Sequence, residues 1–82
     1  MKYARHESGL QAFGQKLREL RKSKGLSQEQ LAWKAELELS QISRIERGVI
    51  SAGLSQVFRI AEALEIHVRE LFDFDFPAAP QG

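Results

Sequence analysis

The chain has no cysteine, two prolines and only one tryptophan among its 82 residues. The lack of cysteine excludes disulfide bonds, thiolate zinc sites and cysteine nucleophiles, and it suits a reducing compartment. No stretch approaches the roughly 20 apolar residues that a membrane-spanning helix needs, and the N-terminal MKYARHESGL has no apolar signal-peptide region. We therefore expect a cytoplasmic protein that does not associate with a membrane.

Residues with catalytic or metal-binding chemistry are also scarce. The two histidines, His6 and His67, lie far apart in the sequence. No combination of nucleophile, base and acid is present, and no glycine-rich loop is placed to hold a phosphate. His67 is more simply a helix cap or a surface residue than a metal ligand. We expect no enzyme activity, no metal and no cofactor.

The composition is that of an ordinary small globular domain. With 43% hydrophobic and 28% charged residues, the chain can form a core, and its length fits a single domain. We expect a flexible N-terminal arm over residues 1–9, one folded domain over residues 10–76 and a disordered tail over residues 77–82, where two prolines and a glycine accumulate.

The charge is unevenly distributed although the net charge is only +1. Residues 1–48 contain ten Lys or Arg and six Glu, whereas residues 49–82 contain two Arg and five Asp or Glu. The densest basic stretch, residues 16–24, holds five basic side chains and one acidic side chain. Such a stretch can bind phosphates, but it is also typical of a solvated helix face.

Helical periodicity dominates the sequence, and no alternating strand pattern competes with it. Apolar residues at positions 10, 13, 17 and 20 predict a first helix that runs to about Lys24, and Gly25 provides the left-handed position that ends it. Ser27 and Gln30 form the pattern of a capping box, which predicts that a second, short helix begins at Gln28.

Three further helices follow. Leu39, Ile42 and Ile45 form the apolar side of a third helix, which Gly48 closes. A fourth helix is predicted to about Leu64 and a short fifth helix from His67. The residues expected on the buried face of the fourth helix are Leu54, Val57, Phe58, Ala61 and Leu64. Together these helices predict a compact all-α domain with five helices.

The second and third helices, joined by three residues, have the arrangement of a helix-turn-helix, in which the second of the two helices lies in the major groove of DNA. The polar side of the third helix carries arginine, which can pair with guanine O6 and N7, and glutamine, which matches adenine N6 and N7. Gln28 and Lys34 flank the preceding helix. From these residues alone, an ordinary solvated face explains the pattern equally well.

A resemblance to a known family favours the DNA-binding interpretation. The stretch LSQEQLAWKAELELSQISRIERG resembles the helix-turn-helix of the phage-repressor and Cro-type transcriptional regulators, and the similarity continues without gaps through LSQVFRIAEALEIHVRELF. Within that family the chain is most similar to small single-domain regulators, including restriction-modification controllers, which typically dimerise. The resemblance implies a lambda-repressor-like fold with its helix-turn-helix at the second and third helices.

The resemblance also implies roles for individual residues. Together with Lys34, the expected DNA-binding residues are Gln28 at a phosphate, the base-contacting positions Leu39, Ser40, Gln41 and Arg44, and the backbone-contacting positions Ser43 and Arg47. Glu46 falls where the family buries an acid against an arginine of the first helix, here Arg21. That structural role of Arg21 competes with direct phosphate binding.

Several residues depart from the family pattern near this site. Glu36 and Glu65 stand where glycine is common, and a non-glycine residue in a left-handed conformation costs about 1 kcal/mol. Glu38 is a poorer helix cap than the usual Ser, Thr or Asp, and Leu39 replaces a commonly polar residue. Trp33 lies off the apolar stripe, and we expect it to be partly buried against the first helix rather than stacked near DNA.

The end of the chain predicts a second interface. Its apolar residues exceed what a short terminal segment usually buries, so we expect Leu71 and one phenylalanine in the core and the surplus at a homodimer interface. The residues assigned to that interface are Val68, Leu71, Phe72, Phe74 and Phe76.

We therefore expect a transcriptional regulator that binds double-stranded DNA sequence-specifically, as a homodimer on a palindromic operator and without a cofactor. Two alternatives stay open. The first is an antitoxin-type autorepressor that also binds a toxin. The second is a protein-interaction module that retains the fold without using the groove of DNA, and Glu36 and Glu38 are the residues in its favour.

Overall fold

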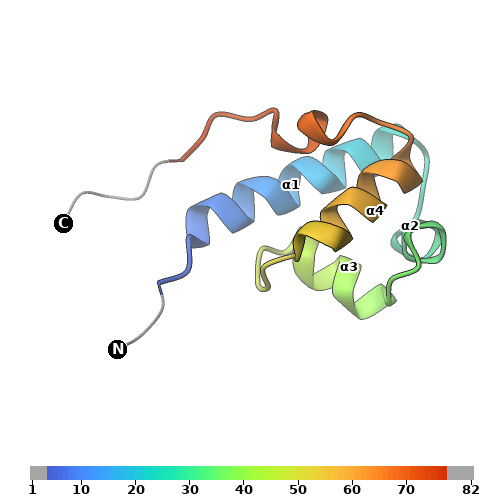
Figure 1. Ribbon diagram of the computed structural model, residues 1–82, viewed down its shortest axis with the longest axis horizontal. Coiled ribbons are helices and arrows are strands. Elements are labelled where there is room, and N and C mark those ends of the chain that lie inside the picture. Colours follow the sequence, from blue (N-terminus) through green and yellow to red (C-terminus); the bar gives the residue numbers. More distant parts are fainter. Residues whose placement is uncertain (1–3, 78–82) are drawn as a thin grey trace.

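The computed structural model describes residues 4–77. This part of the chain forms four α-helices and one 3-10 helix: α1 Glu7–Ser23, α2 Gln28–Ala35, α3 Leu39–Glu46, α4 Leu54–Leu64 and η1 Val68–Phe72 (Figure 1). α1 packs against α3 and η1, α2 packs against α3 and α4, and α4 packs against η1. The all-α helix-turn-helix architecture expected from the sequence is confirmed, with the last helix as a 3-10 helix. None of the helices over residues 4–77 has the length and apolar character to cross a membrane.

Every helix contributes apolar side chains to one continuous core. The large side chains that are completely buried are Leu17, Leu31, Ile42, Ile45, Ile60, Leu64 and Leu71. Removing a leucine or isoleucine side chain from water contributes about 1.5 to 3 kcal/mol, so these residues supply much of the driving force for folding. The core holds α2 and α3 in fixed positions relative to α1 and α4.

Gly14 sets how closely α1 and α3 approach each other. It is buried in the middle of α1, and a Cβ atom added there would lie 2.6 Å from the backbone oxygen of Glu46. Backbone cannot move aside as a flexible side chain can, so any larger residue would push the two helices apart. The absence of a side chain at this position therefore fixes α3 against α1.

The N-terminal boundary of the domain differs from the sequence-based expectation. α1 begins at Glu7, three residues before Leu10, so residues 7–9 belong to the helix and not to an arm. His6 explains the early start, because its Nδ1 accepts a hydrogen bond of 3.0 Å from the backbone N–H of Gly9. A capping histidine of this kind was not recognised in the sequence. The rest of the expected arm, residues 1–3, lies outside the described residues.

Contacts with distant parts of the chain hold this start of α1 in place. The His6 ring stacks on Phe76 with ring centroids 5.3 Å apart, and the Ser8 hydroxyl donates a hydrogen bond to the backbone oxygen of Pro77. Arg5 donates a hydrogen bond to the backbone oxygen of Val49. Pro77, the first residue of the expected tail, is therefore hydrogen bonded to the domain. Residues 78–82 lie outside the described part of the chain.

The predicted helix boundaries inside the domain agree with the structure. The capping box at the start of α2 is present: Ser27 Oγ accepts from the Gln30 N–H at 3.0 Å, and Gln30 Oε1 accepts from the Ser27 N–H at 2.8 Å. His67 caps η1 by accepting a hydrogen bond from the Arg69 N–H. These side chains satisfy N–H groups that have no partner within their own helices.

Glu36 and Glu65 both have φ of 57°, in the left-handed region that ends α2 and α4. Glycine adopts this conformation without steric cost, whereas a side chain there costs about 1 kcal/mol. The structure thus places two glutamates at positions where local backbone geometry favours glycine.

The buried side of α4 is narrower than the sequence analysis expected. Val57, Ala61 and Leu64 are buried, but Leu54 is 71% and Phe58 53% exposed, so their assignment to the core was wrong. Leu54 and Phe58 lie four residues apart, on a row beside the buried row of the helix. The apolar arc of α4 is therefore wider than the surface that α2 and η1 cover.

Candidate nucleic-acid interface

Two short helices joined by a left-handed residue form the helix-turn-helix. α2 ends at Ala35, and the chain turns at Glu36, where the backbone N–H of Leu37 donates to the backbone oxygen of Ala32 at 2.9 Å. α3 then begins at Leu39. Ile42 and Ile45 are buried against the domain, so the opposite side of α3 faces outward.

That outward side carries the side chains expected to contact bases. Ser40 and Arg44 are exposed, Leu39 is 44% exposed, and Arg47 is exposed at the C-terminal end of the helix. Ser43 is half-buried one turn before Arg47. Two long cations, two hydroxyls and an apolar side chain are thus presented along α3, from its start to its C-terminal end.

An open hollow of about 550 Å³ lies between α1, the start of α2 and α3. It brings together four of the expected DNA-binding residues: Gln28, Leu39, Ser43 and Arg47. Arg18 of α1 also lines it, and this residue was not among those assigned from the sequence.

Arg18 belongs to a longer basic surface along α1. With Arg47 it also lines a neighbouring hollow, where Lys22 adds a third basic side chain beside Glu19 and Glu46. The dense basic stretch of residues 16–24 was the available signal, but only the fold reveals which of its members lie beside α3. The helix packing turns Arg18 and Lys22 toward the candidate interface and Arg21 into the protein.

Arg21 and Glu46 form a buried ion pair that joins α1 to α3. Arg21 Nε lies 2.6 Å from Glu46 Oε2, and Arg21 Nη2 donates to Glu46 Oε1 at 3.0 Å. Arg21 Nη1 donates to the backbone oxygen of Leu26 at 2.8 Å. The hydrogen bond with Glu46 raises the pKa of Arg21 above its ordinary value. These groups occupy each nitrogen of a buried side chain, so Arg21 joins α1 to α3 in the structure.

Gln28 extends this network from the start of α2. Its Nε2 donates to Glu46 Oε1 at 3.0 Å, so one carboxylate holds α1 through Arg21 and α2 through Gln28. Since Glu46 lies at the end of α3, the network fixes the orientation of α3 relative to both preceding helices. A bidentate arginine and carboxylate pair gives directional as well as energetic support.

Gln41 is engaged with the beginning of its own helix. Its Oε1 accepts a hydrogen bond from the Glu38 N–H at 3.0 Å. The Glu38 side chain makes no capping hydrogen bond, which agrees with its expected weakness as a cap. A bidentate contact with adenine needs both the oxygen and the nitrogen of the amide. Gln41 would therefore have to release the helix start before it could make such a contact.

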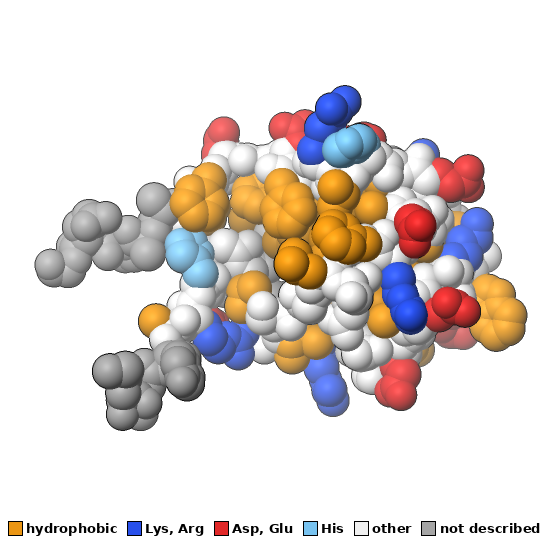
Figure 2. All heavy atoms as spheres, viewed as in Figure 1, with side chains coloured by type: hydrophobic (Ala, Val, Ile, Leu, Met, Phe, Trp, Pro, Cys, Tyr) orange, Lys and Arg blue, Asp and Glu red, His pale blue; other side chains and the backbone are white. Residues whose placement is uncertain are grey.

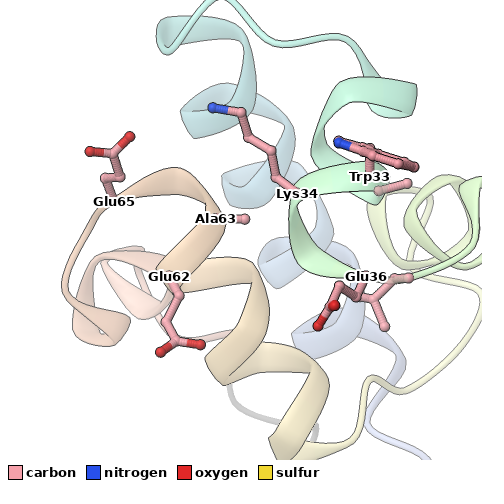
Figure 3. Close-up of a pocket in the computed structure, with 8 residues that line it drawn as sticks. Trp33, Lys34, Glu36, Glu62, Ala63 and Glu65 are labelled. Carbon is pink, nitrogen blue, oxygen red and sulfur yellow. The ribbon is translucent and has the colours of Figure 1, made fainter.

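Lys34 and Trp33 lie outside the hollow beside α3. Lys34 lines a groove between α2 and α4 with Glu36, Glu62 and Glu65, apart from the hollow beside α3 (Figure 3). Trp33 is 85% exposed, so the expected partial burial against α1 was wrong. The sequence placed Trp33 correctly off the apolar stripe of α2 but could not show that no other helix covers it.

The predicted dimer residues divide between core and surface. Leu71 is completely buried and offers no surface to a partner, so its assignment to the interface was wrong. Val68 and Phe74 are half-buried against the core, while Phe72 is 51% and Phe76 71% exposed. Some apolar side chains of the C-terminal segment thus complete the core, whereas Phe72 and Phe76 remain exposed to solvent.

The exposed phenylalanines are continuous with the exposed row of α4. We call this surface the apolar face and define it by Leu54, Phe58, Phe72 and Phe76. All except Phe58 line an apolar groove of about 310 Å³. Figure 2 shows apolar side chains gathered on this side of the molecule, over the start of α4 and the C-terminal segment. Sequence reasoning missed Leu54 and Phe58 because they fit a core stripe.

Comparison with known proteins assigns the chain to a protein family. Residues 17–71 match the HTH_3 family, described as helix-turn-helix. The chain belongs to this family. It is a family of DNA-binding helix-turn-helix transcription regulators, which confirms the resemblance identified from the sequence.

Three proteins of known name are similar to the chain over most of its length. The control protein C.BamHI of Bacillus amyloliquefaciens is 43% identical over 63 residues, which cover 76% of this chain and 78% of that protein. The structure of the restriction-modification controller C.AhdI from Aeromonas hydrophila has 48% identity and a TM-score of 0.78, covering 79% of this chain and 98% of that one. The clp gene regulator ClgR from C. glutamicum has 25% identity and a TM-score of 0.73, covering 77% and 82%.

Proposed function

We propose that this protein is a transcriptional regulator that binds double-stranded DNA sequence-specifically, as a homodimer on a palindromic operator. The observation that supports it best is the combination of an outward polar side on α3 with the buried Arg21–Glu46 pair that fixes this helix. A helix that reads base edges needs both exposed donors and a rigid mounting, because small displacements break bidentate contacts.

The proposed contacts divide by chemistry. Arg44 and Ser40 discriminate bases, and Leu39 meets a thymine methyl group at the start of α3. Arg18, Ser43 and Arg47 bind phosphates beside the hollow and fix the register of the protein on the duplex. Gln28 contributes to DNA binding mainly indirectly, because its hydrogen bond holds Glu46 in position at the end of α3.

The apolar face supplies the proposed homodimer interface. Exposed apolar surface of this kind on a small domain marks an interaction site, and a two-fold axis through it would pair each apolar face with its copy. Two α3 helices could then read half-sites about one helical turn of DNA apart.

The similar proteins suggest a biological setting. C.BamHI is a control protein and C.AhdI is a restriction-modification controller, and this chain covers nearly all of the latter. We propose that the protein controls genes of a restriction-modification system.

Selection of bound duplexes from a random oligonucleotide library, followed by gel-shift titration, tests the DNA-binding role. Arg44→Ala should weaken binding to the selected sequence by about 1 to 3 kcal/mol and relax the preference at one position of each half-site. Arg47→Ala should weaken binding to all duplexes about equally. It should also lower the slope of the logarithm of the binding constant against the logarithm of the salt concentration by about one, as expected for the loss of one phosphate contact. Arg69→Ala is the matched control, since Arg69 is an exposed arginine on η1, which packs against α1 and α4.

Two results would reject this role. The first is a selection that yields no enriched sequence, and the second is an Arg44→Ala variant with unchanged preference. A loss in Arg69→Ala equal to that in Arg44→Ala would show that general positive charge, and not α3, determines binding.

Light scattering tests the homodimer. Phe58→Glu places a charge in the apolar face, so the variant should be a monomer. Its binding to a duplex with two half-sites should weaken more than its binding to a duplex with one half-site. Trp33→Ser removes an exposed aromatic residue from another side of the molecule and should leave the mass unchanged. A dimeric Phe58→Glu variant would exclude the apolar face as the interface.

A further inference from the structure

A third surface lies apart from both proposed interfaces. We call it the Trp33 groove: an open groove of about 640 Å³ between the C-terminal ends of α2 and α4, whose lining includes Trp33, Lys34, Glu36, Glu62, Ala63 and Glu65 (Figure 3). It shares no lining residue with the hollow beside α3 or with the groove at the apolar face. Whatever binds here could therefore do so while DNA and a second protomer are bound.

Trp33 gives this groove an apolar anchor point. The indole is 85% exposed, more than any other large apolar side chain of residues 4–77. Beside it, Leu37 is half-buried and Ala63 of α4 forms part of the floor. A flat, rigid aromatic side chain gives a partner large contact area at little conformational cost, and tryptophan is enriched among the residues that dominate interface energies.

The charges around Trp33 restrict the chemistry of the occupant. Glu36, Glu62 and Glu65 provide three carboxylates against the single ammonium of Lys34. A groove with this excess of negative charge repels phosphate, which argues against DNA as the occupant. It attracts arginine and lysine side chains, and complementary charge both steers association and discourages other partners.

We propose that the Trp33 groove docks a basic segment of a protein partner. In this arrangement an apolar side chain of the partner lies on Trp33 and Ala63, while arginines or lysines on either side of it pair with Glu36, Glu62 and Glu65. The partner is thus identified by its chemistry, an apolar residue flanked by basic ones. The inference does not require that the protein bind DNA.

Trp33 itself provides the measurement, because it is the single tryptophan of the chain. The probe is a synthetic amphipathic helical peptide with two leucines flanked by four arginines. Its addition should shift the Trp33 emission to shorter wavelength in a saturable way, and added salt should weaken this binding. A peptide of the same length with glutamate in place of arginine should produce no shift.

Variants of the acidic residues separate a specific site from general attraction. Replacing Glu36, Glu62 and Glu65 together with glutamine should weaken binding of the arginine peptide about tenfold, as expected for the loss of three exposed pairs. The control replaces three exposed acids outside the groove, by Glu19→Gln, Asp73→Asn and Asp75→Asn. Its net charge changes by the same amount, but it should bind like the wild type because the groove keeps its glutamates. For Trp33→Ser, anisotropy of a labelled peptide should show a comparable loss.

The proposal fails under any of three results. These are an unchanged Trp33 emission at peptide concentrations up to about 1 mM, equal binding of the glutamate peptide, and equal weakening in the control variant. A lower mass for Trp33→Ser by light scattering would also reject it, because the groove would then be a self-association surface. Circular dichroism of each variant verifies that the fold is retained, so these outcomes are independent of whether the protein recognises an operator.

Discussion

The Arg21–Glu46 pair should be among the most sensitive positions for stability. Both side chains are buried, and each nitrogen of Arg21 is hydrogen bonded. Glu46→Ala would leave the Arg21 charge without its partner, which typically costs about 3 to 5 kcal/mol. A domain of 82 residues has a total stability of about 4 to 12 kcal/mol. The loss is therefore a large fraction of the total stability, and the variant should unfold at a much lower urea concentration than the wild type.

A double variant distinguishes loss of the pair from loss of packing. In Arg21→Met/Glu46→Met both charges are absent, so no buried charge lacks a partner, and the stability should return to within about 2 kcal/mol of the wild type. In a cycle completed by the single variants Arg21→Met and Glu46→Met, the coupling energy between the two positions should accordingly exceed about 1.5 kcal/mol. Gln28→Ala should cost only about 1 kcal/mol, because it removes one of the hydrogen bonds to Glu46 and leaves the ion pair.

Urea unfolding followed by far-ultraviolet circular dichroism is the appropriate assay. Trp33 fluorescence would report poorly on unfolding, since the side chain is already 85% exposed in the folded protein. If Glu46→Ala lost less than about 1 kcal/mol, or if the single-variant losses simply added in the double variant, the pair would not be the link between α1 and α3.

Three further substitutions test the backbone and capping arguments. Gly14→Ala should destabilise the domain by at least about 2 kcal/mol in the same urea assay, because the added Cβ meets the α3 backbone; a neutral effect would show that α1 and α3 can separate cheaply. Glu65→Gly should stabilise it by up to about 1 kcal/mol by relieving the left-handed strain, and a loss would mean that the side chain contributes more than it costs. Glu38→Ser should add about 0.5 to 1 kcal/mol as a better helix cap, which a lower urea midpoint would contradict.

The parts of the fold that could be predicted are those determined by local rules. The helix-turn-helix followed from Ser27 and Gln30 at the start of α2 and from the buried isoleucines of α3, because capping and periodicity act within a few residues. The Arg21–Glu46 contact joins distant residues, and it came from the family resemblance. The spacing of residues within one helix does not show that an arginine of α1 contacts the end of α3.

The errors share a different cause: they concern which side of a helix another helix covers. The apolar arc of α4 includes Leu54 and Phe58, and only the positions of the neighbouring elements α2 and η1 determine that both remain exposed. The same holds for Trp33 and Lys34, which line the groove between α2 and α4 and not the hollow beside α3. Composition and spacing carry little information about such neighbours.

The exposed departures from local preference coincide with the proposed contact surfaces. Glu36 and Glu65 occupy left-handed positions and line the Trp33 groove, while Leu54 and Phe58 leave apolar area in water on the apolar face. Each choice lowers the stability of the isolated domain, by about 1 kcal/mol at each glutamate. Such costs concentrate at functional sites, where a partner recovers them on binding. A sequence optimised for the isolated fold would have glycine at both turns and polar residues on the outer row of α4, and it would lose the charge of one surface and the apolar area of the other.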